Sequence, residues 1–398
     1  MCGIAGFSSF DKDYTAIENY FKSRIDILKK MRQSFAYRGN DQTGECLRRN
    51  VGFSHTRLSI RDISGGAQPM IKSRDGAEYI IVFNGEIYNT GELTLRLKSL
   101  GYKFETTCDT EVILLLYMQY GTRCVDYLNG IFAFAIWDGG NNTLMLARDR
   151  AGVKPLFYTV QNGELIFASE IKGLFAHPDI KPRISINGFR EIFGVGPART
   201  HGCGVFDDVS EIVPGHFAVF SESGLTLHKY WDLKSKVHKD SYAETVDKVS
   251  YLVRDAITSQ MVSDVPVCSF LSGGIDSSIV TAVSASYMKK SGGKLNTFSF
   301  DFSGNDKYFT SNSFQPERDR PYVDIMLGHI NTNHTYLECD EENLADLLFD
   351  AMKVKDLPGM ADVDASMLYF CSLVKEKNKV ALTGAVSYTH LTLPTILR

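Results

Sequence analysis

Hydrophobic and polar residues follow two different patterns along the chain, and the pattern changes near residue 230. Between about 51 and 220, short apolar runs such as 79–83 and 131–137 dominate, and they predict strands. Over 17–31, apolar residues recur instead at helical spacing and predict an amphipathic helix. Many strands with few helices predict an α+β sandwich of sheets covered by helices.

One turn signal refines this first half of the chain. Asn162-Gly163 lies between two strand-like runs, and both residue types tolerate positive φ, so we expect a tight hairpin there. The remaining predicted elements are strands at 2–9, 143–147, 156–160 and 164–168, and helices near 91–100 and 110–120.

The second half begins after a polar linker, predicted at residues 221–240. Ser241 and Glu244 stand three positions apart just before an apolar periodic run, which is the capping-box signature of a helix start. A strand, a loop, a helix and a strand are then predicted at 265–271, 272–276, 277–288 and 295–302. This order is typical of an α/β domain with a parallel sheet.

Composition indicates a globular protein of two or three domains and excludes several classes of function. The 398 residues are 44% hydrophobic and 23% charged, with a net charge of -4. Because no basic stripe occurs, we expect neither nucleic-acid nor membrane binding. The N-terminus lacks the basic lead of a signal peptide. Eight scattered cysteines without a Cys-x-x-Cys pair argue against zinc and disulfides and favour a cytoplasmic protein.

Cys2 is the first candidate for chemistry. Aminopeptidases remove an initiator Met before a small residue, and residue 2 would then carry both a thiol and an α-amino group. An α-amino group, with an ordinary pKa of about 7.7–8.0, can act as the base for that thiol. Taken alone, Cys2 is more readily explained as a small apolar residue of an edge strand.

Other residues change that balance, because a glutaminase must hold a zwitterion that carries a side-chain amide. Arg57 offers a planar cation for a carboxylate. Asn84 and Gly85 offer amide and backbone N–H donors for an oxyanion, and Asp109 offers an anion at a helix start. Each also has a structural interpretation, as a surface ion pair, a hairpin turn or a helix cap.

Short motifs, in order across residues 1–220, resemble those of the class II glutamine amidotransferases, whose nucleophile is an N-terminal cysteine. The motifs are Met-Cys-Gly-Ile-Ala-Gly at 1–6, Tyr-Arg-Gly at 37–39, His-Thr-Arg-Leu-Ser-Ile at 55–60, Ala-Gln-Pro-Met at 67–70, Asn-Gly-Glu-Ile-Tyr-Asn at 84–89, Ala-Arg-Asp-Arg at 147–150, Gly-Val-Lys-Pro-Leu-Phe-Tyr at 152–158 and Ala-Ser-Glu-Ile-Lys at 168–172. The resemblance implies the N-terminal-nucleophile (Ntn) hydrolase sandwich. One departure is Asn40, where the family usually has a proline, and it loosens that turn.

The resemblance also implies roles at a glutamine site. Cys2 would be the nucleophile, and Asn84 with Gly85 would form the oxyanion hole. The glutamine carboxylate would be held by Arg57 and the backbone of Leu58, Ser59 and Ile60, and the amino group by Glu86 and Asp109.

A second motif, Ser-Gly-Gly-Ile-Asp-Ser at 272–277, lies at a predicted strand-to-helix turn. Glycines let the backbone approach phosphate, and a helix N-terminus offers free N–H groups. No Gly-Lys-Ser/Thr follows, so this is not a Walker loop. The motif resembles the pyrophosphate loop of ATP pyrophosphatases, which implies ATP, with Mg²⁺ offsetting its charge. The implied ATP-binding residues are Leu271, Ser272, Gly273, Gly274, Asp276, Ser277 and Phe300.

A class II glutaminase followed by this loop is the arrangement of the glutamine-hydrolysing asparagine synthetases. The resemblance, over residues 1–384, implies a ligase that adenylates aspartate and transfers ammonia from glutamine to it. Its partners would be glutamine, aspartate and ATP, and a homodimer stays open. The alternatives are an amidotransferase of the same architecture with another carboxylate acceptor, or a binding protein that has lost catalysis. Residues 356–364, before a helix predicted from Ser366, lie where synthetases recognise the acceptor.

The last residues depart from the family pattern. After the strand-like run at 380–384, relatives continue into a loop Gly-Glu/Asp-x-x-Asp-Glu, whereas residues 385–398 contain no acid and no helical period. We expect this tail to be non-native. The synthetase domain, at 241–384, would then be incomplete, while the glutaminase domain, at 2–220, would be intact.

Overall fold

The structure is a computed structural model, and it describes residues 1–311 and 316–384. The chain divides into two compact units, with the boundary between Ser235 and Lys236. Each unit has its own sheets and is described by itself. The tail expected at 385–398 to be non-native lies outside the described residues.

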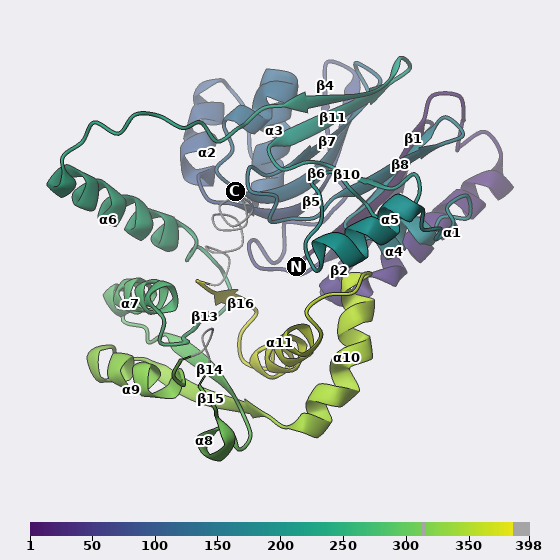
Figure 1. The fold of residues 1–398 in the computed structure, drawn as a ribbon. Coiled ribbons are helices and arrows are strands. Elements are labelled where there is room, and N and C mark those ends of the chain that lie inside the picture. Colours follow the sequence, from purple (N-terminus) through teal and green to yellow (C-terminus); the bar gives the residue numbers. More distant parts are fainter. Residues whose placement is uncertain (312–315, 385–398) are drawn as a thin grey trace. The chain divides into compact units, whose positions relative to one another are not determined.

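The first unit contains two antiparallel sheets of six strands each (Figure 1). One sheet has the order β10-β8-β9-β1-β3-β2, and the other has the order β12-β11-β7-β6-β5-β4. The strands are β1 (Gly3–Ser9), β2 (Gln42–Leu47), β3 (Val51–Arg57), β4 (Met70–Arg74), β5 (Ala77–Ile87), β6 (Gly130–Asp138), β7 (Thr143–Arg148), β8 (Phe157–Gln161), β9 (Glu164–Ala168), β10 (Ser210–Glu211), β11 (His216–Ser221) and β12 (Gly224–Lys229). The predicted hairpin at Asn162-Gly163 is confirmed, since both residues have positive φ between β8 and β9.

Two clusters of buried side chains lie on the two faces of the sheet that contains β5. Ile4 and Phe53 of one sheet share a buried cluster with Ile80 of the other. Side chains alternate across a strand, so Ile81 and Phe83 point to the opposite face, where they pack under two helices.

The helices are α1 (Glu18–Ser34), α2 (Thr90–Ser99), α3 (Asp109–Tyr120), α4 (Ile171–Phe175) and α5 (Ile186–Arg190). Because α2 and α3 cover one sheet and α1 and α4 cover the other, the predicted αββα sandwich is confirmed.

Two boundaries in this unit differ from the prediction. The linker predicted at 221–240 begins too early, because 224–229 forms β12, which pairs with β11 at the edge of a sheet. Its outward positions are exposed and polar, so it resembles a loop in sequence. The strand predicted at 79–83 continues through Asn84 and Gly85 to Ile87, where pairing with β6 is unbroken.

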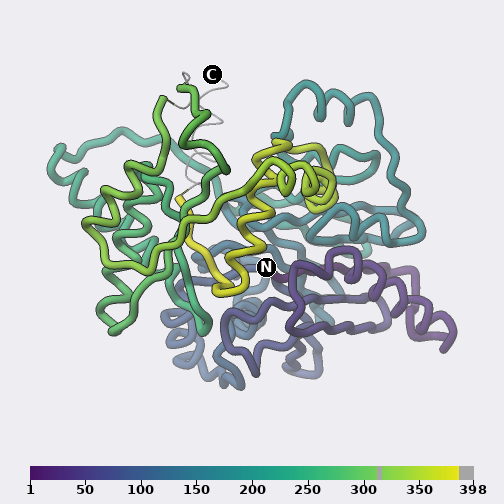
Figure 2. Tube along the Cα trace, turned by 90° about the horizontal axis from the view of Figure 1, so that it is seen from below, coloured from purple at the N-terminus to yellow at the C-terminus, as the bar shows by residue number. Residues whose placement is uncertain are grey.

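The second unit contains a four-stranded parallel sheet of order β15-β14-β13-β16. Its elements are α6 (Tyr242–Ser259), β13 (Val267–Phe270), α7 (Ile275–Lys290), β14 (Asn296–Phe302), α8 (Asn305–Tyr308), α9 (Arg320–His329), β15 (Asn333–Cys339), α10 (Glu341–Lys355), α11 (Ala361–Val374) and β16 (Val380–Leu382). Figure 2 traces 341–374 as two helices that lie side by side. The parallel-sheet prediction for this half is confirmed.

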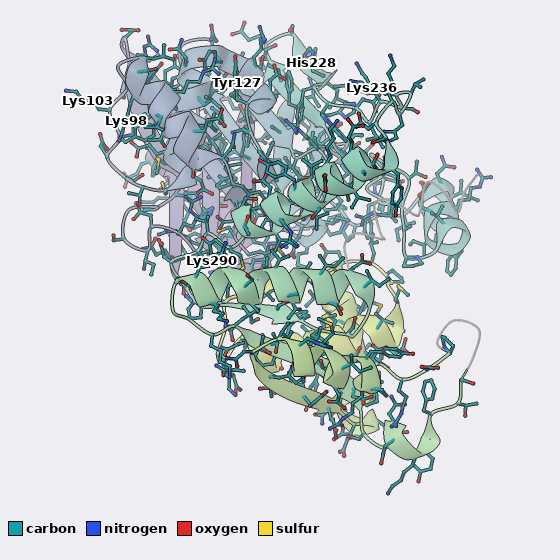
Figure 3. All side chains as sticks on the ribbon, turned by 90° about the vertical axis from the view of Figure 1, so that its left-hand side faces the viewer. Lys98, Lys103, Tyr127, His228, Lys236 and Lys290 are labelled. Atoms are coloured by element: carbon teal, nitrogen blue, oxygen red, sulfur yellow. The ribbon has the colours of Figure 1, made fainter. Side chains whose placement is uncertain are left out.

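Charges and caps explain where the helices of this unit begin and end. The capping box of Ser241 and Glu244 starts α6 as predicted. Lys290 lies in the last turn of α7, where a cation favours the negative end of the helix dipole (Figure 3). The helix predicted from Ser366 begins earlier, because the Asp364 carboxylate accepts the Met360 N–H at 2.7 Å and acids favour the first turn.

Candidate active sites

A small cavity of about 30 Å³ lies beside the first residues of β1. Its lining comes from segments that are far apart in the sequence: Cys2, Arg57, Leu58, Ile60, Arg61, Gly66, Gln68, Phe83, Gly85, Glu86, Cys108, Asp109 and Thr110. The fold therefore brings the predicted glutamine-site residues together, and the remaining two, Asn84 and Ser59, are buried next to lining residues. The enclosed part of this cavity holds about two water molecules.

Cys2 is held at the entrance to β1 by two backbone contacts. Its thiol sulfur lies 3.8 Å from the Leu58 carbonyl oxygen, and its own carbonyl accepts the Arg38 Nε–H at 2.8 Å. Burial raises the pKa of the Cys2 thiol, so the resting side chain is protonated and needs a base. Burial also lowers the pKa of the α-amino group of Met1 to about 5. An amine at this position is therefore unprotonated at neutral pH and has a lone pair that can accept a proton.

Asn84 and Gly85 stand on β5 beside this thiol. Asn84 is 1% exposed, and its side-chain nitrogen and oxygen have no hydrogen-bond partner among the described residues. An unpartnered buried amide is costly, and it is typical of a group that is paired only when a substrate arrives. At Gly85 a Cβ atom would stand 2.2 Å from the Ile131 carbonyl oxygen, so only glycine permits this close strand pairing. The two residues therefore offer donors on a rigid strand.

Glu86 and Asp109 form a carboxylate pair in the same cavity. The Asp109 carboxylate accepts the Ile87 N–H at 3.1 Å at the start of α3. Burial, together with the negative charge of Asp109, raises the pKa of Glu86 to about 8. Burial raises the pKa of Asp109, while Arg61 opposes that shift. Two buried carboxyl groups that resist ionisation favour a cationic ligand, which would offset their charge.

Arg57 lies in the cavity wall with most of its guanidinium engaged. One terminal nitrogen donates to the Gln42 side chain at 2.7 Å and the Ile63 carbonyl at 3.1 Å. The other donates to the carbonyls of Arg61 at 3.1 Å and Asp62 at 2.6 Å. Arg57 therefore holds the 61–63 segment in place. An incoming carboxylate can reach only its Nε–H unless that segment moves.

Three cations near this cavity, Arg38, Arg61 and Lys154, are not among the site residues predicted from the sequence. Arg61 lines it and donates to the Ile87 carbonyl and to Thr90 Oγ1, each at 3.0 Å. Arg38 holds the carbonyl of Cys2. Lys154 is 7% exposed, and its ammonium donates to the Met1 sulfur at 3.2 Å. Arg38 and Lys154 both lie within motifs that resemble those of the family, and this resemblance could have identified them as site residues. Sequence spacing does not show, however, where their side chains point.

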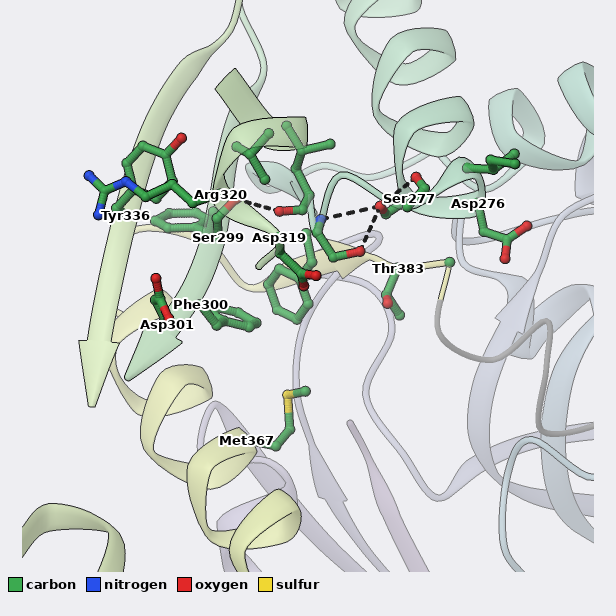
Figure 4. Close-up of a pocket in the computed structure, with 18 residues that line it drawn as sticks. Asp276, Ser277, Ser299, Phe300, Asp301, Asp319, Arg320, Tyr336, Met367 and Thr383 are labelled. Atoms are coloured by element: carbon green, nitrogen blue, oxygen red, sulfur yellow. Dashed lines mark hydrogen bonds between the residues drawn. The ribbon is translucent and has the colours of Figure 1, made fainter. Parts of the chain in front are cut away.

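The second unit has a larger cavity, of about 480 Å³, at the carboxyl ends of its parallel strands (Figure 4). Six of the seven predicted ATP-binding residues line it, and the seventh, Gly273, lies within the same loop: the six are Leu271, Ser272, Gly274, Asp276, Ser277 and Phe300. Ser272 and Ser277 close the loop through their hydroxyl groups, 2.9 Å apart. Ser299 Oγ donates to the Leu271 carbonyl and joins the loop to β14.

The residues of this cavity fit a nucleotide and a cation. Gly273 has a φ of 80°, and a Cβ there would meet the Tyr322 Cβ at 2.6 Å. The loop runs into the N-terminus of α7, which offers free N–H groups to phosphate. Asp276, Asp301 and Asp319 line the cavity without lying together as one group, and one or two carboxylates with the phosphates of a nucleotide are enough to hold Mg²⁺. The apolar part of the wall includes Phe298, Phe300 and Met367.

One group of three potential metal ligands occurs among the described residues, and it does not suit a metal. Glu164, His177 and Asp179 lie together in the first unit. His177 Nδ1 accepts the Asp179 N–H at 3.3 Å, so in a neutral ring Nε2 carries the proton and cannot ligate. Glu164 is already paired with Lys12 and Arg24. All eight cysteines are free. No helix within the described ranges is long and apolar enough to cross a membrane.

Comparisons with known proteins match two family models to successive parts of the chain. The family described as "Glutamine amidotransferase domain" matches residues 1–231, and the family described as "Asparagine synthase" matches residues 248–387. The chain is 46% identical, over 96% of its length, to asparagine synthetase (glutamine-hydrolysing) 3 of Bacillus subtilis, and it spans 62% of that protein.

Two further relatives show how the resemblance extends. A Methanocaldococcus jannaschii protein, provisionally named asparagine synthetase (glutamine-hydrolysing) 2, is 32% identical over 90% of the chain, which covers 68% of that protein. Amidase chyE of Penicillium rubens is 31% identical over 98% of the chain, which covers 58% of that protein. The chain belongs to the glutamine amidotransferase family, in the branch whose second domain is an asparagine synthase domain.

Proposed function

We propose that the first unit hydrolyses glutamine at Cys2 and that the released ammonia is used by the second unit. What carries this proposal is that the Cys2 thiol, Gly85 and a carboxylate pair line one cavity, with the unpartnered Asn84 amide buried next to it. After Met1 is removed, the α-amine of Cys2 takes the thiol proton while sulfur attacks the glutamine amide carbon. The oxyanion would be held by Asn84 Nδ2 and the Gly85 N–H.

The substrate's own charges fit the same cavity. Its α-ammonium would pair with Glu86 and Asp109, whose resistance to ionisation a cation relieves. Its α-carboxylate would bind Arg57 and the backbone of 58–60, once the segment that Arg57 holds has moved. The proton on the amine then passes to the leaving ammonia, and water hydrolyses the thioester to glutamate.

The second unit would use ATP to activate aspartate, and asparagine would be the product, so the whole chain would act as a carbon–nitrogen ligase. The loop at 272–277 and the N-terminus of α7 support phosphate binding. Mg²⁺, held by carboxylates such as Asp276, would offset the negative charge of the triphosphate. The β-carboxylate of aspartate would attack the α-phosphorus of ATP, which forms an adenylate and releases pyrophosphate, and ammonia would then displace AMP to give the amide.

A different acceptor is the second candidate. Amidase chyE and amidase chry2 of Gibberella zeae are 31% and 33% identical to the chain, so proteins that are not named asparagine synthetases share this sequence pattern. The segment at 356–364, predicted to face the acceptor, contains the start of α11. Another carboxylate in place of aspartate would leave the glutamine site unchanged.

One labelling experiment tests both steps. Protein whose mass shows that Met1 is absent is incubated with glutamine labelled with ¹⁵N at the amide, ATP and aspartate. Labelled ammonia and labelled asparagine are expected. Labelled ammonia with AMP release only when another carboxylate replaces aspartate would favour the second candidate. A folded, processed protein that forms no labelled ammonia would contradict the glutaminase proposal.

A further inference from the structure

Lys154 is a buried cation without an anionic partner. It precedes β8, is 7% exposed, and makes no ion pair within 4.0 Å among the described residues. Its ammonium donates to the sulfur of Met1, at 3.2 Å, which is a weak acceptor. Burial, and next the charge of Arg38, lower the pKa of Lys154, whereas the acidic groups Glu86, Cys2 and Asp149 oppose that shift. Because a buried charge is retained only at considerable cost, an unpaired ammonium beside a candidate nucleophile indicates a function.

The charges around Lys154 are mostly committed to other contacts. Arg38 donates to the Cys2 carbonyl at 2.8 Å and to Glu170 at 2.6 Å. Asp149 accepts backbone N–H groups, including that of Lys154 at 3.0 Å. Glu86 acts on Lys154 electrostatically but belongs to the carboxylate pair described above.

The anions that face the N-terminus are committed in the same way. The Asp41 carboxylate accepts the Ser59 N–H at 2.7 Å. Asp109, which acts on the thiol, accepts the Ile87 N–H. The ammonium of Lys154 therefore lies next to the N-terminus, and its side-chain hydrogen bond there is to the thioether sulfur of Met1.

The Met1 sulfur marks where this ammonium points. It lies 3.2 Å from Lys154 Nζ and 4.0 Å from a terminal nitrogen of Arg38. Once Met1 is removed, both cations lose this contact, and the new α-amine belongs to Cys2. A positive neighbour disfavours protonation of an amine and favours ionisation of a thiol.

We propose that Lys154 is a positioning residue of the glutaminase centre, whose ammonium keeps the α-amine of Cys2 unprotonated so that it can accept the thiol proton. This inference rests on the glutaminase function proposed above. The proton leaves sulfur for the α-nitrogen as the carbon–sulfur bond forms, and Lys154 exchanges no proton in that step. Its charge, and not its ability to donate, is what matters.

The test compares Lys154→Met with Lys154→Arg in the full chain. The rate of ammonia release, as kcat/KM for glutamine, is measured from pH 5 to pH 9. In Lys154→Met the midpoint of the acidic limb should move up by about one pH unit, since removal of a nearby like charge eases protonation of the amine. Lys154→Arg keeps the charge and should retain the wild-type midpoint. An unmoved midpoint in Lys154→Met, or an equal movement in both variants, would overturn the proposal.

A second readout does not depend on glutamine. The pH dependence of alkylation of Cys2 by iodoacetamide, followed by peptide mass, reports the same amine and thiol. It should move in Lys154→Met and stay in place in Lys154→Arg. If the wild-type protein releases no ammonia, the proposed function fails, while the alkylation profiles still decide the role of Lys154. If Lys154→Met does not fold, Lys154→Gln takes its place as the charge-removing variant: a moved profile supports the role, and an unmoved one overturns it.

Discussion

The two candidate sites differ in size and in the part of the chain that does the binding. The candidate glutamine site has a volume of about 30 Å³ and is surrounded by buried ionisable side chains whose pKa values are shifted. The candidate nucleotide site has a volume of about 480 Å³ and is built on the backbone of a glycine loop and the start of α7. Proton transfer requires matched pKa values, whereas a polyphosphate requires N–H groups at close range. Activity at the first site should therefore be most sensitive to changes of ionisable side chains, and binding at the second site should be most sensitive to added bulk next to the backbone.

The largest effect is expected at the nucleophile. Cys2→Ala should lower ammonia release by about 10⁴-fold or more, because no other group can form the thioester. Binding of ATP by the second unit, measured by calorimetry, should not change. Cys371→Ala is the matched control, since Cys371 is an exposed cysteine of the second unit. Ammonia release that survives in Cys2→Ala would mean that the first site does not work through its thiol.

The oxyanion donor should have the next largest effect. Asn84→Ala should lower kcat for ammonia release by about 10²–10³-fold with little change in KM, because the donor acts on charge that develops in the transition state. Thermal unfolding should hardly change, since the Asn84 amide has no partner to lose within the described residues. Asn141→Ala, whose amide donates to Asp138 at a turn, is the control. A rise in KM at constant kcat would place Asn84 in ground-state binding instead.

The second site should respond to added backbone bulk. Gly273→Ala should weaken ATP binding by about tenfold or more, since the new Cβ would stand 2.6 Å from the Tyr322 Cβ. Gly292→Ala is a matched control, because Gly292 has a similar φ of 77° but no atom within 4 Å of a Cβ. Glutaminase activity should be the same in both. Equal losses of ATP binding would show that backbone strain, and not the space around the loop, sets the requirement.

The smallest effect is the pH dependence of glutamine binding. The pKa of Glu86 is raised to about 8, so Glu86 is mostly protonated at pH 7 and binds the α-ammonium poorly. KM should therefore fall several-fold as the pH rises from 7 to 8.5. Glu86→Gln should remove this dependence. If KM in the wild type does not change with pH, Asp109 alone binds the α-ammonium group of glutamine.

The same shift predicts the direction in which stability changes with pH. The folded protein retains the Glu86 proton up to about pH 8, whereas the unfolded chain releases it near the ordinary value of 4.5. Folding is thus favoured at low pH by this group, and its contribution is lost as the pH rises from 4.5 through 8. The midpoint of urea unfolding in the wild type, compared with that in Glu86→Gln, measures the contribution.

Sequence patterns predicted the elements and the residues whose type alone suits the chemistry. Asn84 and Gly85 could be identified because an amide beside a glycine has a direct chemical use, although their place inside β5 was not foreseen. Edge strand β12 falls within the predicted linker, because its alternation is short and its outward side chains are polar. The contacts of Arg57 and Lys154 could not be predicted from the sequence. Arg57 donates to backbone carbonyls whose positions depend on the fold, and Lys154 donates to the sulfur of Met1, which is distant in sequence.

The position of the first residue has a practical consequence for anyone who expresses this protein. The α-amino group lies among Arg38, Lys154 and Cys2, so a tag fused ahead of Met1 would place a peptide bond where a free amine is proposed to work. Such a fusion would purify as a folded yet inactive protein. Cleavage that leaves even one extra residue would have the same result. A self-cleaving leader that exposes Cys2 itself would release the activity and show how much processing limits it.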